Sequence, residues 1–254
     1  MVNIRRMIGY LMVLFLVICC KGEQRKQAGG THGHVKVFRM VADTFVCRDS
    51  LNDSPTERQM RALGFVDIQE VDASIQVCLI YATADNFVGK VLYRDLRKAF
   101  MLPETAWRLV KAQQKLKKIR PDLSLLIYDA ARPMEVQREM WAQVRGTDKR
   151  MYVSNPANGG GLHNYGAAID LTLVDAEGNP LPMGSAFDYF GNEARPDCEI
   201  SMVKQGRILP GYLKNRRLLR QVMTESGFRI LSGEWWHFNL LSREEAKRTL
   251  KVIE

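Results

Sequence analysis

The segment GGLHNYGAAIDLTLV, residues 160–174, changes from a polar, glycine-rich loop into an apolar run. Residues 167–174 (AAIDLTLV) are apolar and partly β-branched, and NPANGGG (155–161) contains turn-forming residues, so we expect a loop that enters a buried strand. Asp170 interrupts this run. An unpaired carboxylate inside such a strand costs several kcal/mol or becomes protonated, and a metal ion is one partner that would remove the cost.

Segments on both sides of this strand predict further strands and helices. We expect strands at 74–81 and 123–128, helices at 103–118, 134–144 and 215–226, a hairpin that begins at 228–231, and a last short helix after the capping-box pattern of 242–245. Helices before and between strands, followed by a late hairpin, indicate an α+β fold. The expected architecture is a single compact domain with a central, largely antiparallel sheet and flanking helices.

The histidines give the first indication of chemistry. His163 and His237 are the only histidines after residue 35, and the second lies in the motif GEWWHFNL (233–240). With Asp170 they provide three ligands of the types that a catalytic zinc uses, which leaves a fourth position for water. Glu234 is a carboxylate placed to take the proton of that water. Although His163 and Asp170 alone would favour a surface histidine and a turn aspartate, the set predicts a zinc peptidase with one zinc ion.

The spacing of Glu234 and His237 places a demand on the backbone. They are three residues apart, and positions at odd separation in a regular strand face opposite ways. Glu234 must therefore precede the strand or lie at a bulge if both side chains are to reach one ion, and Gly233 makes such a turn sterically easy. The intervening Trp235 and Trp236 favour the core or a pocket wall.

Arg132 is a further candidate, since it follows the expected strand at 123–128 and precedes Pro133. Its guanidinium could form a salt bridge with Asp129, or it could stabilise the oxyanion that forms when water attacks a carbonyl, and the sequence leaves both readings open. Residues 179–195 are rich in proline, glycine and asparagine without sustained periodicity, so they predict a long loop of the kind that shapes a substrate pocket.

Four motifs, in this order and spacing, resemble those of the zinc D-alanyl-D-alanine dipeptidases: YDAARP (128–133), LHNYGAAIDLTL (162–173), PMGSAFDYF (182–190) and EWWHF (234–238). The resemblance extends from Val71 to Leu241. It implies a fold shared with Hedgehog-type and D-Ala-D-Ala carboxypeptidase domains. It also implies residue roles: zinc ligands His163, Asp170 and His237, general base and then acid Glu234, transition-state stabiliser Arg132, and Asp188 as the carboxylate that receives the free amino group of a dipeptide.

The activity that this resemblance implies is zinc-dependent hydrolysis of the dipeptide D-alanyl-D-alanine to two D-alanines in cell-wall peptide metabolism. The family usually has a serine two residues before the first zinc histidine, where it helps to hold the substrate amine, and this chain has Gly161 there. One alternative is therefore a murein DD- or LD-carboxypeptidase or endopeptidase of the same fold, acting on murein-derived peptides. Another is a zinc-stabilised binding domain without turnover, against which Glu234 and Arg132 argue.

The N-terminal residues predict export. Arg5 and Arg6 precede the apolar run 7–18, whose length suits a signal peptide better than a membrane span, and Cys20 at its end resembles the lipidated cysteine of a bacterial lipoprotein. We expect a signal or lipoprotein segment at 1–20, a flexible tether at 21–34 and the zinc peptidase domain at 35–254. A short uncleaved anchor is the alternative. Either way the domain lies outside the cytoplasm, in the periplasm, and meets the membrane only through this anchor.

The net charge and the remaining cysteines indicate no other function. Of the formal charge of +9, +4 lies in the first 27 residues, and no nucleic-acid-binding motif is recognisable, so a nucleic-acid partner is not expected. His32 and His34 lie in the tether, where a solvated pair is favoured over a metal site. Cys47, Cys78 and Cys198 match no zinc-ribbon or CxxC spacing; export permits one disulfide among them, and Cys78 is expected to be buried.

Overall fold

The computed structural model describes residues 52–254. The expected segments at 1–20 and 21–34, the start of the domain at residue 35, His32, His34 and Cys47 lie outside the described residues, and those expectations stay predictions. The helices and strands are, in chain order, α1 (Pro55–Ala62), β1 (Val66–Asp67), α2 (Ile68–Val71), β2 (Gln76–Val77), β3 (Phe100–Met101), α3 (Pro103–Ile119), β4 (Ser124–Asp129), α4 (Met134–Val144), β5 (Ala168–Val174), α5 (Glu199–Lys204), α6 (Pro210–Thr224), β6 (Arg229–Leu231), β7 (Glu234–Asn239) and α7 (Arg243–Thr249).

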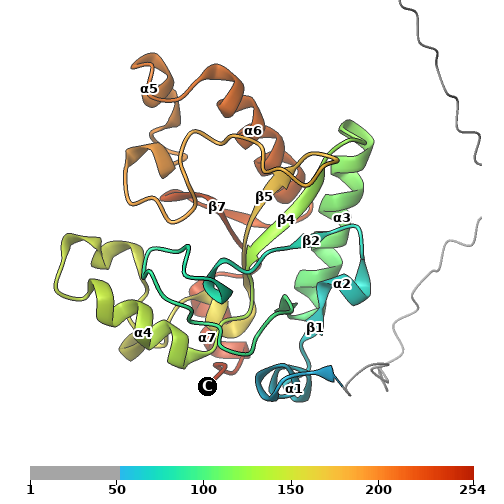
Figure 1. Cartoon of the computed structure of the whole chain (residues 1–254), viewed down its shortest axis with the longest axis vertical. Coiled ribbons are helices and arrows are strands. Elements are labelled where there is room, and N and C mark those ends of the chain that lie inside the picture. Colours follow the sequence, from blue (N-terminus) through green and yellow to red (C-terminus); the bar gives the residue numbers. More distant parts are fainter. Residues whose placement is uncertain (1–51) are drawn as a thin grey trace, which may run out of the picture. The chain divides into compact units, whose positions relative to one another are not determined.

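A five-stranded sheet forms the centre of the domain, with strand order β2-β4-β5-β7-β6. The pair β2–β4 is parallel, whereas β4–β5, β5–β7 and β6–β7 are antiparallel. A separate antiparallel pair joins β1 and β3. The predicted α+β fold with a largely antiparallel sheet is confirmed, and Figure 1 shows β4 and β5 side by side at its centre.

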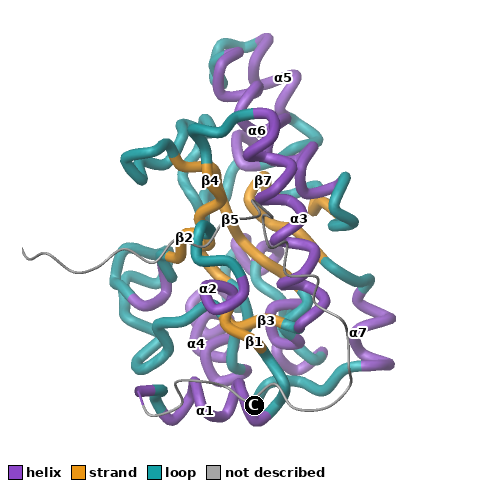
Figure 2. The backbone as a smooth tube through the Cα atoms, turned by 90° about the vertical axis from the view of Figure 1, so that its right-hand side faces the viewer, coloured by secondary structure: helices purple, strands orange, loops and turns teal. Residues whose placement is uncertain are grey.

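The central strand β5 is buried at every position. A strand with both faces covered is expected to be apolar almost throughout, as the run at 167–174 is. The helices α3 and α6 pack against each other and against the central strands, as Figure 2 shows from the side of α3. Their inward positions include Leu109 and Leu116 of α3 and Leu219 of α6, none of which is exposed. Asp170 therefore sits in the middle of the core-forming strand.

The strand expected at 74–81 is much shorter than predicted. Only Gln76–Val77 form β2, at one edge of the sheet, and a 3-10 turn at Ile80–Ala82 (η2) follows. Ile75 and Leu79 are buried, but Cys78 is exposed. The prediction that Cys78 is buried is therefore wrong, because Cys78 immediately follows β2 at the edge of the sheet and its side chain faces solvent, whereas those of Ile75 and Leu79 face the core.

Two helix boundaries show how local sequence acts. The helix expected from residue 215 begins earlier, at Pro210, because proline is well suited to the first turn of a helix. The capping box before α7 is confirmed: the Glu245 backbone N–H donates to Ser242 Oγ over 3.2 Å, and the Ser242 N–H donates to the Glu245 carboxylate over 2.8 Å.

Gly166 is required by the turn that leads into β5. Its φ is +64°, and an added Cβ would lie 2.1 Å from Cε1 of the buried Phe65 ring. We expect Gly166→Ala to lower the free energy of unfolding by about 2 to 4 kcal/mol, because it combines left-handed backbone strain with overpacking. Urea unfolding measures this loss. The matched control is Gly211→Ala in α6, where an added Cβ meets nothing within 4 Å; an equal loss in both variants would contradict the steric explanation.

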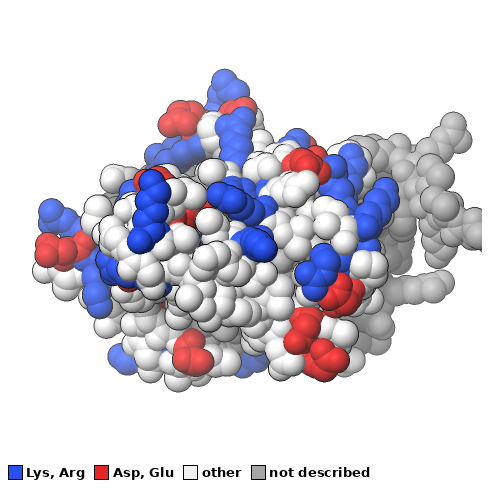
Figure 3. Space-filling view, turned by 90° about the horizontal axis from the view of Figure 1, so that it is seen from above, with Lys and Arg blue, Asp and Glu red and all other residues white. Residues whose placement is uncertain are grey.

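The described surface carries charges of both signs. On the face that Figure 3 shows, Lys and Arg side chains stand among neutral ones, and several have Asp or Glu beside them. Within residues 52–254, no helix is both long enough and apolar enough to cross a lipid bilayer.

Candidate metal centre and substrate cavity

Two neighbouring strands and one turn bring the three predicted metal ligands together. Asp170 of β5 and His237 of β7 are directly paired in the antiparallel register. His163 lies in the 3-10 turn Leu162–Tyr165 (η5), which ends at the left-handed Gly166 immediately before β5. His163 and Asp170 are thus separated by a turn and a strand start, which allows both side chains to reach the same point.

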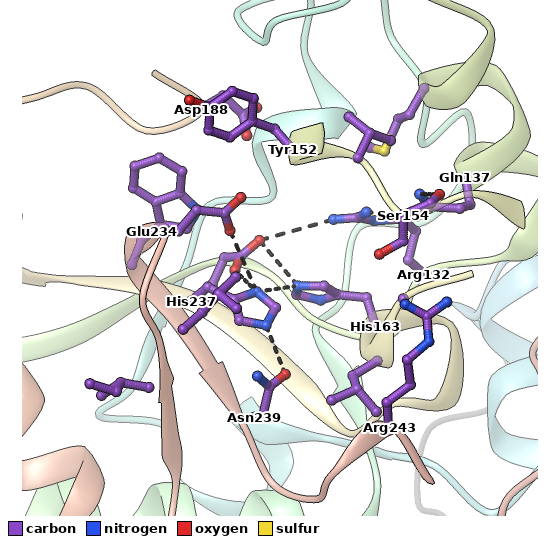
Figure 4. A pocket seen from close by; sticks show the side chains of 18 of the residues that line it. Arg132, Gln137, Tyr152, Ser154, His163, Asp188, Glu234, His237, Asn239 and Arg243 are labelled. Atoms are coloured by element: carbon purple, nitrogen blue, oxygen red, sulfur yellow. Dashed lines mark hydrogen bonds and ion pairs between the residues drawn. The ribbon is translucent and has the colours of Figure 1, made fainter. Parts of the chain in front are cut away.

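The ligand atoms are close enough to share one ion. His163 Nε2 lies 3.2 Å from His237 Nδ1 and 3.2 Å from Asp170 Oδ2, and His237 Nδ1 lies 2.9 Å from Asp170 Oδ1 (Figure 4). Ligand atoms about 2 Å from a tetrahedral zinc lie roughly 3.3 Å from one another. Two imidazoles and one carboxylate at these separations therefore fit a zinc ion, with room for a fourth ligand.

Hydrogen bonds on the outer side of each imidazole select the nitrogen that faces the centre. His163 Nδ1 lies 2.8 Å from the carbonyl oxygen of Ala130, which can only accept, so Nδ1 carries the proton and Nε2 is free to bind a metal. His237 Nε2 lies 2.8 Å from Asn239 Oδ1, which leaves Nδ1 facing the centre. Such partners orient metal-binding histidines and raise their basicity.

The electrostatics keep Asp170 in the form that a metal needs. Burial opposes its ionisation, but the charges and hydrogen bonds of His163 and His237 hold the pKa of Asp170 well below its usual range. Burial also opposes charging of His163, and the nearby Asp170 carboxylate outweighs it and raises the pKa of His163. Asp170 is therefore a carboxylate at neutral pH, as a metal ligand must be.

Asn239 tests the importance of this outer hydrogen bond. We expect Asn239→Ala to weaken zinc binding by about 10- to 100-fold, because the ring of His237 loses its orienting acceptor. Competition with a chromophoric zinc chelator measures the affinity. Asn239→Asp, which keeps an acceptor oxygen, should retain most of it. Equal losses in both variants would show that the hydrogen bond to Nε2 is not the cause.

Glu234 reaches the same centre through a bulge in β7. Leu231 pairs with Glu234, yet the adjacent Ile230 pairs with Phe238, so β7 has extra residues between 234 and 238. This irregularity allows Glu234 and His237, which are three residues apart, to face the same ion, as the sequence analysis required. Glu234 Oε2 lies 3.9 Å from His237 Nδ1. Burial raises the pKa of Glu234 to about 7, and although the nearby His237 opposes this rise, the carboxylates of Asp170 and Asp188 add to it.

Arg132 forms the salt bridge that the sequence left open, and its guanidinium also lies close to the predicted metal ligands. Its Nε and Nη2 donate to Asp129 Oδ2, the first over 2.9 Å, so the salt bridge exists. Its Nη1 donates to Gln137 Oε1 over 2.9 Å, and Nη2 lies 4.0 Å from Asp170 Oδ2. The guanidinium is thus a cation held at the edge of the metal centre by Asp129 and Gln137.

Asp129 organises more of the site than the sequence indicated. Its side chain is fully buried, and it accepts hydrogen bonds from Arg132 and from the Tyr93 hydroxyl. Its Oδ2 also lies 3.5 Å from His163 Nδ1. Its place at the end of an apolar strand was a signal for a buried, paired carboxylate, but nothing in the sequence indicated Tyr93 as a partner.

Asp188 lies in the long loop between β5 and α5, in a left-handed conformation with φ 58°. Both of its carboxylate oxygens accept from the Tyr81 hydroxyl, each at 3.0 Å. Burial raises the pKa of Asp188 to about 7, and the Asp170 carboxylate contributes. A strained backbone held by a hydrogen bond from another segment is a common feature of functional sites.

All six predicted site residues line one cavity of about 440 Å³: Arg132, His163, Asp170, Asp188, Glu234 and His237. The wall also contains residues that the sequence did not single out, namely Tyr81, Gln137, Ser154 and Asn239. Trp236 lines the cavity, whereas the neighbouring indole of Trp235 donates to Ser185 Oγ over 2.9 Å. Titratable groups and a metal-ligand set thus converge on a concave, partly aromatic pocket, the usual form of an active site.

Comparison with known proteins gives one consistent family. Residues 61–254 match the peptidase M15 family model, described as D-ala-D-ala dipeptidase. The chain is 35% identical over 175 residues to the D-alanyl-D-alanine dipeptidase of Escherichia coli, a match that covers 69% of this chain and 83% of that protein. It is 29% identical over 198 residues to the D-alanyl-D-alanine dipeptidase of Enterococcus faecium, which covers 70% of this chain and 92% of the relative.

Proposed function

Since this chain belongs to the peptidase M15 family of D-ala-D-ala dipeptidases, we propose that it hydrolyses D-alanyl-D-alanine to two molecules of D-alanine in cell-wall peptide metabolism. The observation that carries this proposal is the convergence of a His-Asp-His ligand set, a buried glutamate, an arginine and an aspartate on one cavity. The cofactor that fits the ligand set is a single zinc ion.

The ligand residues His163, Asp170 and His237 would hold the zinc, which would polarise the scissile carbonyl and lower the pKa of a water molecule. Glu234 takes the proton from the attacking water and later returns it to the leaving amine. The Arg132 guanidinium stabilises negative charge on the carbonyl oxygen. Each of these side chains lies in the wall of the cavity.

Asp188 supports the choice of a free dipeptide as substrate. A carboxylate held by Tyr81 inside the cavity provides an anionic acceptor for the free amino group of D-alanyl-D-alanine. In a murein peptide the corresponding nitrogen is an uncharged amide, which would leave Asp188 without its charged partner. A site built for such a pairing rejects ligands that lack the partner group.

A substrate series tests the proposal. The zinc-loaded protein is incubated with D-alanyl-D-alanine, with N-acetyl-D-alanyl-D-alanine and with a muropeptide that ends in D-alanyl-D-alanine. We expect two D-alanines from the free dipeptide and a kcat/KM at least about 100-fold lower for the other two. Release of alanine from the muropeptide alone would favour a carboxypeptidase. Zinc binding without turnover of any substrate would favour a binding domain.

The location of the domain rests on the N-terminal sequence alone. Residues 1–20 are proposed as an export or lipoprotein segment and residues 21–34 as a tether, which together would place the peptidase in the periplasm as a membrane-attached lipoprotein. Fractionation of cells that express the full chain tests this proposal; recovery of the protein in the cytoplasm would overturn it.

A further inference from the structure

Ser154 and Gly161 are neighbours in the wall of the cavity. A Cβ placed on Gly161 would lie 3.0 Å from Ser154 Oγ and 3.3 Å from Ser154 Cβ. The backbone of Gly161 has φ −105°, a conformation open to any residue. A glycine at 161 is therefore not needed for the turn itself, and its effect on the site is to leave space for the side chain of Ser154.

The backbone of Ser154 is held by Gln137, which also holds Arg132. Gln137 Nε2 donates to the Ser154 carbonyl oxygen over 2.7 Å, and Gln137 Oε1 accepts from Arg132 Nη1 over 2.9 Å. The Gln137 side chain is almost fully buried, with 1% of its surface exposed. Ser154 and the guanidinium are thus fixed relative to each other through one amide.

The hydroxyl of Ser154 is available for a ligand. It makes no hydrogen bond with any residue of the described part of the chain, 52–254, although Ser154 is half-buried and lines the cavity. Three other polar side chains of the wall are engaged: Tyr81 with Asp188, Gln137 with Arg132, and Asn239 with His237. A hydroxyl can donate one hydrogen bond and accept two, so Ser154 is an unused polar group in a prepared position.

The position of Ser154 indicates which end of a dipeptide it meets. A serine at position 161 helps to hold the substrate amine in the family, whereas Ser154 is held next to Arg132 by Gln137 and lies, in Figure 4, on the opposite side of the cavity from Asp188 and Glu234. A dipeptide whose amine lies at Asp188 presents its carboxylate away from that acidic side. A hydroxyl donor next to a guanidinium is well suited to a carboxylate, because the cation favours the charge and the hydroxyl adds a directed hydrogen bond.

We propose that the Ser154 hydroxyl donates a hydrogen bond to the C-terminal carboxylate of the substrate, and that Gly161 keeps open the space which this hydroxyl needs. The proposal rests on the dipeptidase function above and adds a determinant of specificity: the free carboxylate of the dipeptide is recognised at Ser154. Neither residue takes part in the proton transfers of the reaction.

The first test compares wild type with Ser154→Ala on D-alanyl-D-alanine and on D-alanyl-D-alanine amide, with zinc content measured for both proteins. We expect KM for the free acid to rise about tenfold with kcat little changed, and KM for the amide, whose neutral carbonyl oxygen is a weaker acceptor, to rise much less. An unchanged KM for the acid, or an equal rise for acid and amide, would overturn the proposal. Calorimetric binding of both ligands is measured in parallel; a wild type that neither binds nor cleaves the dipeptide would refute the proposed function as well.

The second test asks whether Gly161 acts through Ser154. In the wild-type background Gly161→Ala should raise KM for the free dipeptide about tenfold, because the added Cβ displaces the Ser154 hydroxyl. In a Ser154→Gly background the same substitution should have no further effect. Gly146→Ala, where an added Cβ meets nothing within 4 Å, is the matched control. Equal effects of Gly161→Ala in both backgrounds would separate Gly161 from Ser154 and contradict this part of the proposal.

Discussion

Replacement of Glu234 by glutamine lowers kcat for D-alanyl-D-alanine by about 1000-fold, within the range that general acid–base groups contribute. The substitution keeps the size of the side chain and removes its ability to accept a proton. Because Glu234 takes a proton from water and returns it to the leaving amine, the loss affects both halves of the reaction. The zinc content stays at one ion per chain, since the ligand set consists of His163, Asp170 and His237.

The surroundings of Glu234 explain why this residue suits the task. It lies at the bulge of β7, with Oε2 3.9 Å from His237 Nδ1. Glu234 is thus next to the ligand set of His163, Asp170 and His237 but is not part of it. Burial raises its pKa to about 7. A carboxyl group with a pKa near the working pH can both accept and release a proton, whereas one with an ordinary pKa would return it poorly.

The measurement combines steady-state kinetics with metal analysis of the same preparation. Glu244→Gln, an exposed glutamate of α7, is the matched control and should retain full activity and zinc. Unchanged hydrolysis by Glu234→Gln would exclude Glu234 as the general base. Loss of zinc together with activity would show instead that Glu234 is itself a ligand.

The elements nearest the site were the easiest to predict from sequence. Helix α4 has the bounds that were expected, 134–144, and β4 and β5 lie within one residue of the predicted strands. Each has an apolar pattern of a single period and a clear breaker at one end, Pro133 before α4 and Gly166 before β5. Local sequence decides such elements because the pattern and the turn chemistry agree.

The partners of the site residues could not be predicted in the same way. Tyr81 and Asp188 are 107 residues apart, and Tyr93 and Asp129 are 36 apart, so their hydrogen bonds exist only after the sheet and the long loop are assembled. The sequence contains no local sign that one tyrosine rather than another reaches a given carboxylate. The prediction that Cys78 is buried was wrong for a related reason. The position of β2 at the edge of the sheet depends on the order of all five strands.

The spacing between Glu234 and His237 lies between these two cases. The sequence showed that a regular strand could not direct both side chains to one ion, and it offered Gly233 as the place for an irregularity. The structure has the irregularity inside β7, where the register with β6 shifts between Ile230 and Leu231. Strand geometry therefore predicted that an irregularity was needed between Glu234 and His237. Its location could not be predicted, because it depends on how β7 pairs with β6.

Asp170→Ala is expected to weaken zinc binding by well over 100-fold, beyond the loss that changes around the ligands cause. Asp170 is the only carboxylate in the three-residue ligand set found within residues 52–254, and its removal leaves two histidines to hold the ion. Since a ligand that binds only the folded state stabilises it, zinc should raise the melting temperature of the wild type and have little effect on that of the variant. Hydrolysis of the dipeptide should fall to background.

Thr172→Val in the same strand separates this effect from damage to the core. Thr172 lies two residues from Asp170 on the same face of β5, and its buried hydroxyl makes no hydrogen bond within residues 52–254, so valine should fit with unchanged zinc affinity and equal or higher stability. Mass spectrometry for metal content, chelator competition and thermal melts with and without zinc distinguish the variants.

If Asp170→Ala bound zinc as tightly as Thr172→Val does, the carboxylate would not be a ligand, and its burial in the most apolar strand of the sheet would need another explanation. The expected contrast follows from the geometry, because only Asp170 places its oxygens 2.9 and 3.2 Å from the two imidazoles.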